Sequence, residues 1–203
     1  MSIKRQIGFT VVEMIIAVGI AAFTTLLAST FFYQGFRLWR LNQYQIEAQN
    51  NIRTAVRSLV AELREARTAD NGAYPIEAAA PTTITFFSNI DADASQERIR
   101  YFIQGTDLLK GVTNPTGVPA TYPPANETVK TVASFIRNTD PVFTYFPDTY
   151  TGTGQSMTVP VVIGNVRLVK ISVTVDSNLT EYPAATRLET SVSLRNLKDN
   201  LGD

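Results

Sequence analysis

The chain has 203 residues and contains neither cysteine nor histidine. The absence of cysteine excludes disulfides and thiol nucleophiles, and it leaves the redox compartment open. The absence of histidine removes a common zinc ligand and the usual general base near neutral pH. A hydrolase would have to work without a histidine triad. We therefore predict a protein that is not an enzyme and that binds no cofactor.

The sequence also lacks an excess of either charge, because 18 Lys and Arg residues balance 18 Asp and Glu residues. Proteins that bind nucleic acid generally carry a clustered excess of basic residues. We predict no nucleic-acid partner.

One long apolar segment stands out, residues 9–33, in which Glu13 is the only charged residue. A helix rises about 1.5 Å per residue, so the segment is long enough to cross a hydrocarbon core of about 30 Å. Cleavable secretory signals have a shorter apolar stretch, about 7–15 residues. The segment therefore predicts a retained, single membrane-spanning helix.

The helix is expected to continue through residues 34–69, because residues 37–67 contain no proline or glycine. Apolar residues recur there at the spacing of one helical face, which predicts an amphipathic half. The Asp70-Asn71-Gly72 turn and Pro75 should end the helix. The predicted apolar face consists of Ile52, Val56, Leu59, Val60 and Leu63.

Residues 70–203 have the character of a β domain, with runs of β-branched and aromatic residues. Alternation in the last two runs predicts an antiparallel sheet with one buried face, which the apolar face of the helix would cover. Two stretches rich in Pro, Gly and Thr, 111–126 and 147–156, are expected to be exposed loops. The predicted class is α+β. The predicted strands are 83–87, 98–103, 142–146, 166–175 and 186–194.

Glu13 is unexpected inside the apolar segment. A charge in the middle of a membrane costs about 2.5–3.5 kcal/mol, although the cost falls near the surface. The helix dipole returns only about 0.3–1 kcal/mol. Either Glu13 is a tolerated carboxylate of an ordinary signal anchor, or it meets a positive charge from a chain terminus or another molecule.

The sequence from Lys4 to Glu13, KRQIGFTVVE, resembles the class III signal of type IV pilins and type II secretion pseudopilins. In that family a prepilin peptidase cuts after a glycine that ends a short basic leader, and the new N-terminal residue is methylated. The resemblance implies a leader of residues 1–8 with Lys4 and Arg5 as its basic residues. It also implies cleavage between Gly8 and Phe9, N-methylation of Phe9, and Glu13 at the fifth mature position.

The resemblance gives Glu13 a purpose, because in the family this glutamate pairs with the N-terminal amine of a neighbouring subunit during assembly. An α-amino group has a pKa of about 7.7–8.0 and is largely protonated near neutral pH. The implied architecture is the pilin fold, a long N-terminal helix packed on an antiparallel sheet. The implied location is the inner membrane, crossed once, with residues 70–203 outside the cytoplasm.

Two departures bear on which member the chain resembles. Many major pilins have a helix-bending proline where this chain has Thr30, and many have a cysteine pair near the C-terminus. The layout is most like the minor J-type pseudopilins or W-type minor pilins, which implies a structural subunit of a tip complex that primes assembly. Expected partners are other pilin or pseudopilin subunits, the prepilin peptidase and the inner-membrane assembly platform. A pilus-displayed adhesin or DNA-uptake subunit is the alternative.

Two smaller features complete the sequence interpretation. Trp39 with Phe31, Phe32, Tyr33 and Phe36 is typical of an interfacial aromatic belt, or of a bundle between subunits.

Residues 91–95, DADAS, could contribute to a calcium site, but they lack the EF-hand pattern. We interpret them as a solvated loop and predict no metal site.

Overall fold

The computed structural model describes residues 10–91, 93–176 and 185–194. Its elements are one long helix, α1 (Val11–Arg64), two short 3-10 turns and eight strands. The strands are β1 (Ile76–Ala80), β2 (Thr83–Ser88), β3 (Glu97–Gln104), β4 (Asp107–Thr113), β5 (Thr128–Ala133), β6 (Phe143–Phe146), β7 (Leu168–Val175) and β8 (Thr186–Ser193). The predicted α+β class, with a long N-terminal helix and antiparallel sheet structure, is confirmed.

The chain divides into two compact units, Met1–Gln43 and Tyr44–Asp203. The described part of the first unit is almost entirely the beginning of α1. The second unit holds the rest of α1 and all the strands.

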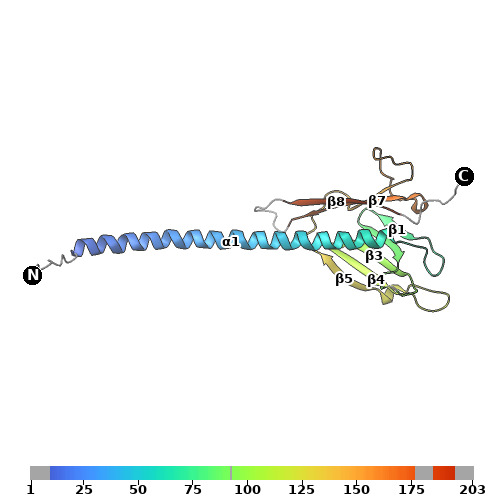
Figure 1. The fold of residues 1–203 in the computed structure, drawn as a ribbon, viewed down its shortest axis with the longest axis horizontal. Coiled ribbons are helices and arrows are strands. Elements are labelled where there is room, and N and C mark those ends of the chain that lie inside the picture. The colour runs from blue at the N-terminus through green and yellow to red at the C-terminus, as the bar shows by residue number, and fades with distance from the viewer. Residues whose placement is uncertain (1–9, 92, 177–184, 195–203) are drawn as a thin grey trace, which may run out of the picture. The chain divides into compact units, whose positions relative to one another are not determined.

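The strands of the second unit form two antiparallel sheets, where the sequence predicts one. The first sheet has the order β1-β2-β3-β4-β5 and the second the order β6-β7-β8. In Figure 1 the labels of β7 and β8 lie above the last part of α1, and those of β3, β4 and β5 lie below it. The helix residues from 44 onward therefore have sheet structure on two sides.

All five predicted strands are present, and three further strands were missed: β1, β4 and β5. The sequence predicts no element at the start of β4, and it places the end of β4 in an exposed loop that begins at Gly111. That part of the prediction is wrong, because Gly111 and Thr113 are buried. The helix ends at Arg64, five residues before the predicted end at Ala69. It ends there because the chain turns to the sheet: the N–H of Arg67 donates to the carbonyl of Phe87 in β2, at 2.9 Å.

The core is a single cluster to which the helix and both sheets contribute. The predicted apolar face of the helix is confirmed, since Leu59 and Leu63 are fully buried and only Val60 is half-buried. The predicted alternation of β7 is confirmed as well. Its buried apolar side chains are Val169, Ile171, Val173 and Val175, and Ser172 on the other face is buried as well.

Polar contacts fix how the helix lies on each sheet. Glu62 accepts a hydrogen bond from the Tyr101 hydroxyl at 3.0 Å and forms an ion pair with Lys110 at 2.6 Å. Burial, together with the charge of Glu62, raises the pKa of Tyr101 far above its ordinary value. Toward the second sheet, the side-chain amide of Gln49 donates to the Thr186 hydroxyl at 2.8 Å. These bonds are directional, so they select one rotation of the helix among those that would bury its apolar face.

A second polar cluster crosses the first sheet. Arg100 donates two hydrogen bonds to Glu127, from Nε at 2.8 Å and from Nη2 at 2.5 Å. The carboxylate of Glu127 lies over Gly111 of β4, where an added Cβ would collide with it. Glycine at position 111 therefore makes room for this ion pair. Arg98 adds an ion pair to Glu77 on β1 at 2.6 Å.

The Arg100–Glu127 pair predicts a pH dependence of stability. Its hydrogen bonds hold the pKa of Glu127 below the ordinary 4.5. Because folding lowers this pKa, the pair contributes fully above the unfolded value and is lost as the pH falls through the folded value. Glu127→Gln should therefore lower the free energy of unfolding at pH 7 by about 1.5 kcal/mol. The difference from the unsubstituted chain should shrink as the pH is taken from 5 to 3, measured by urea unfolding.

Glu77→Gln provides the matched control, because Glu77 also pairs with an arginine of β3 but is more exposed. Exposed ion pairs contribute about 0–1 kcal/mol. An equal loss in the two variants would show that the position of Glu127 over Gly111 has no special weight.

Candidate functional site

The residues predicted for processing, Lys4, Arg5, Gly8 and Phe9, lie outside the described residues, as does the whole predicted leader 1–8. Of the predicted site, the structure describes Glu13.

Glu13 lies in the first turn of α1 and is exposed. Its backbone N–H donates to the Thr10 hydroxyl at 3.3 Å. Thr10 therefore caps the start of the helix. A carboxylate in a first helical turn interacts favourably with the helix dipole. Within the described residues, no lysine or arginine forms an ion pair with Glu13. Its charge is therefore open to a partner from outside the described chain.

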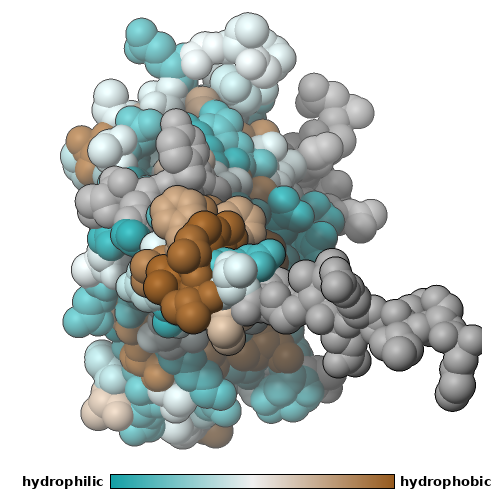
Figure 2. Space-filling view, turned by 90° about the vertical axis from the view of Figure 1, so that its left-hand side faces the viewer, coloured by the Kyte–Doolittle hydropathy of each residue, from teal (hydrophilic) through white to brown (hydrophobic). Residues whose placement is uncertain are grey.

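The surface around Glu13 is apolar on every side of the helix. An 18-residue window of α1 has a mean hydropathy of 2.2, and none of that window is buried within the structure. The helix is long and apolar enough to cross a membrane, by length and composition. Figure 2 shows brown, apolar side chains over the end of α1 that faces the viewer. Such a surface requires lipid or other helices to cover it.

The serine and threonine hydroxyl groups between residues 24 and 30 are bonded within the helix itself. Thr25 donates to the carbonyl of Ala21 at 2.7 Å, Ser29 to that of Leu26 at 2.8 Å, and Thr30 to that of Leu27 at 2.8 Å. Polar groups in hydrocarbon must be satisfied internally. The hydroxyls are therefore compatible with an apolar environment, which composition alone did not show.

Four of the five aromatic residues predicted as a belt line one hollow on α1, and Tyr33 is exposed outside it. The hollow has a volume of about 310 Å³ and is lined by Phe31, Phe32, Phe36, Trp39 and Gly35. Gly35 has no side chain to fill it. Phe31 and Phe32 meet edge to face, with ring centroids 6.5 Å apart. All four side chains are exposed, so the hollow can accept an apolar group from lipid or from another helix.

Trp39 is the only tryptophan in the chain, so its fluorescence reports this site alone. If the aromatic residues form a membrane-interface belt, lipids brominated near the headgroup should quench Trp39 more strongly than lipids brominated at the chain ends. The measurement uses the full chain in lipid nanodiscs, with Trp39→Phe to set the background. Strongest quenching by the deepest bromines would place the tryptophan in the hydrocarbon core and contradict the belt.

A cluster of three acidic groups lies at the start of β3, and its third member was not foreseen. The predicted loop residues Asp91 and Asp93 are exposed, as expected, but Glu97 at the start of β3 joins them and is buried. One carboxylate oxygen from each of the three lies within 4.8 Å of the others. The sequence interpretation covered residues 91–95 only. Glu97 alternates with Ile99 and Tyr101 along the strand, and this spacing would have placed it on the core-facing side of β3.

No protein-family model matches the sequence, and no curated protein matches it. Among solved structures, a chain of the GspK-GspI-GspJ complex from the type 2 secretion system of enterotoxigenic Escherichia coli aligns with 73% of this chain and 97% of its own length. The sequence identity is 11% and the TM-score is 0.45. This likeness is too remote to assign a family or a function.

Proposed function

We propose that this chain is a minor pilin or pseudopilin, a structural subunit of a type II secretion pseudopilus or a type IV pilus. The first half of α1 holds the subunit in the membrane and later joins a bundle of helices. Residues 70–203 form the domain outside the cytoplasm that selects partner subunits. The chain carries out no catalysis in this role.

One observation carries the proposal: a single carboxylate, that of Glu13, stands on a helix segment that is otherwise apolar and uncovered. Lipid can cover the apolar side chains but cannot neutralise the carboxylate. A bundle of helices covers the apolar side chains, and it can also bring a cation that neutralises Glu13. The assembly of subunits meets both requirements of this surface.

The N-terminal amine of another subunit supplies that cation in the proposal. A prepilin peptidase cuts between Gly8 and Phe9 and so creates an amine four residues before Glu13. Methylation of Phe9 retains the positive charge.

Arg37 and Arg40 beyond the apolar segment match Lys4 and Arg5 in number, so the charge count does not set the orientation. The leader must reach the peptidase on the cytoplasmic side, and this places the C-terminal end of the helix outward.

A minor rather than a main position in the filament is supported by the uninterrupted first half of the helix. Thr30 stands where a bending proline is common in main subunits, and its hydroxyl bonds to Leu27 within a regular helix. In this position the chain helps to prime assembly on the inner-membrane platform.

Filament shearing in the native host tests this proposal. The sheared fraction should contain the chain together with other pilin or pseudopilin subunits, and deletion of its gene should abolish secretion or piliation. The deletion phenotype also identifies the machine. A chain that stays wholly in the membrane fraction, and whose deletion changes neither process, would contradict the proposal.

A further inference from the structure

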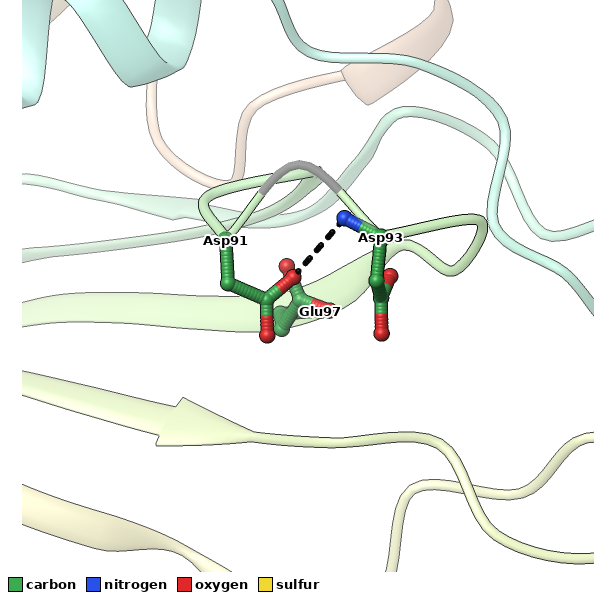
Figure 3. Close-up of side chains that lie close together, drawn as sticks. All are labelled: Asp91, Asp93 and Glu97. Carbon is green, nitrogen blue, oxygen red and sulfur yellow. Dashed lines mark hydrogen bonds between the residues drawn. The ribbon is translucent and has the colours of Figure 1, made fainter.

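The acidic cluster at the β2–β3 connection combines two exposed carboxylates with a buried one. Asp91 and Asp93 lie on the connection, and Glu97 is the first residue of β3, with 1% of its surface exposed. Figure 3 shows Glu97 between the two aspartates, with its carboxylate beside theirs. The aspartates leave the cluster open to solvent on one side.

Glu97 is incompletely satisfied in this position. Its Oε2 accepts a hydrogen bond from the N–H of Ile90 at 2.9 Å, but its buried Oε1 has no hydrogen-bond partner. A buried charged group without partners is strongly destabilising. Within the described residues this oxygen is a free acceptor that a ligand could fill.

Three neighbouring carboxylates favour a positively charged ligand at this point. Within residues 10–91, 93–176 and 185–194, no lysine or arginine forms an ion pair with any of the three carboxylates. Three acids are thus held together, and none of the described residues places a cation between them.

The spacing of the oxygens fits one metal ion. Calcium binds oxygen at about 2.3–2.6 Å, so two oxygens on one calcium lie at most about 5 Å apart. The three carboxylate oxygens meet this limit, since all lie within 4.8 Å of one another. Calcium accepts irregular geometry and takes its remaining ligands from carbonyls or water, whereas magnesium requires a near-ideal octahedron.

We propose that Asp91, Asp93 and Glu97 form a calcium site that fastens the β2–β3 connection to the first sheet. Glu97 anchors the ion to β3, and the two aspartates close over it from the loop. The aspartates are already positioned for this: Asp93 Oδ1 accepts from the Ser95 N–H and hydroxyl, and Asp91 Oδ1 accepts from the Asp93 N–H at 3.3 Å. The site is independent of the assembly function proposed above.

Calorimetric titration of the full chain in detergent with calcium chloride tests the site. We expect one site with a dissociation constant below about 1 mM, and weaker binding of magnesium. Glu97→Gln and Asp93→Asn should each weaken calcium binding at least about tenfold. Asparagine at 93 keeps the Oδ1 that Ser95 uses, so this variant changes the charge with little change to the loop. Asp148→Asn, in another exposed loop, should bind calcium as the unsubstituted chain does.

The melting temperature provides a second readout, because Glu97→Gln should have opposite effects on it without calcium and with calcium. In chelator, Glu97→Gln should melt above the unsubstituted chain, because the substitution removes an unpaired buried charge. In 10 mM calcium, the unsubstituted chain should gain stability and the variant should not. The proposal is overturned by an unsubstituted chain that binds no calcium, or by binding that is undiminished in both Glu97→Gln and Asp93→Asn. Binding that magnesium matches at equal concentration would overturn it as well. If Glu97→Gln fails to fold, Asp93→Asn decides the question alone.

Discussion

Replacing Glu13 with leucine is expected to remove the chain from assembled filaments while cleavage after Gly8 continues. The substitution makes the membrane segment more apolar, so insertion is preserved. It deletes the carboxylate to which the amine of the neighbouring subunit would bind. That amine would then be left in a bundle of low dielectric without its counter-charge.

The expected loss is large, because removing one partner of a buried ion pair costs about 3–5 kcal/mol. At about 1.4 kcal/mol for each factor of ten, incorporation should fall at least about a hundredfold. The measurement compares the chain in sheared filaments with the chain in the membrane by quantitative immunoblotting. Mass spectrometry of the membrane fraction verifies that cleavage has occurred.

Glu47→Leu is the matched control, because Glu47 is an exposed glutamate on the same helix, beyond the apolar segment. It should be incorporated normally. Glu13→Asp keeps the charge on a shorter side chain and should retain part of the incorporation. Normal incorporation of Glu13→Leu would disprove the docking role of this carboxylate.

Leu59→Ala is expected to destabilise the second unit by about 3 kcal/mol, since Leu59 is fully buried in the core that the helix shares with the strands. For a unit of this size, the melting temperature should fall by about 6–12 °C. Circular dichroism of the full chain in detergent measures the change through the loss of β structure.

Ile46→Ala is the control for Leu59→Ala, because it also truncates an apolar residue of the helix to alanine but at an exposed position. Ile46 is on the same helix, but 51% of its surface is exposed. Its truncation should change the free energy of unfolding by no more than about 0.5 kcal/mol. Similar losses at the two positions would show that the helix is not held by the apolar face described here.

The parts of the fold that were predicted correctly are those with strong local periodicity. The helical face through Leu59 and Leu63 repeats over several turns, and the alternation of β7 continues over most of the strand. Both patterns arise from burial on one side of a regular element. They are therefore visible in the sequence without knowledge of what covers them.

The missed strands lack such a pattern. β1, IEAAA, is rich in alanine, which has low strand propensity, and β5, TVKTVA, is mostly exposed. Pairing with neighbouring strands holds both in place, and pairing is a long-range property. The division into two sheets depends on the same long-range pairing, so local sequence did not predict it.

The candidate sites show the same limit. Glu13 was recognised because one charge in an apolar run is a local anomaly. Glu97 was overlooked because its importance comes from burial and from its distance to Asp91 and Asp93, which only the β2–β3 hairpin creates. The Arg100–Glu127 pair and its place over Gly111 likewise depend on the register of three strands.

The N-terminus of the mature chain from its native host tests the central claim most directly. Intact-mass analysis should find a chain that begins at Phe9 and carries one added methyl group on its amine. A chain that begins at Met1 would contradict the account, because Glu13 would then have no freshly exposed amine to bind.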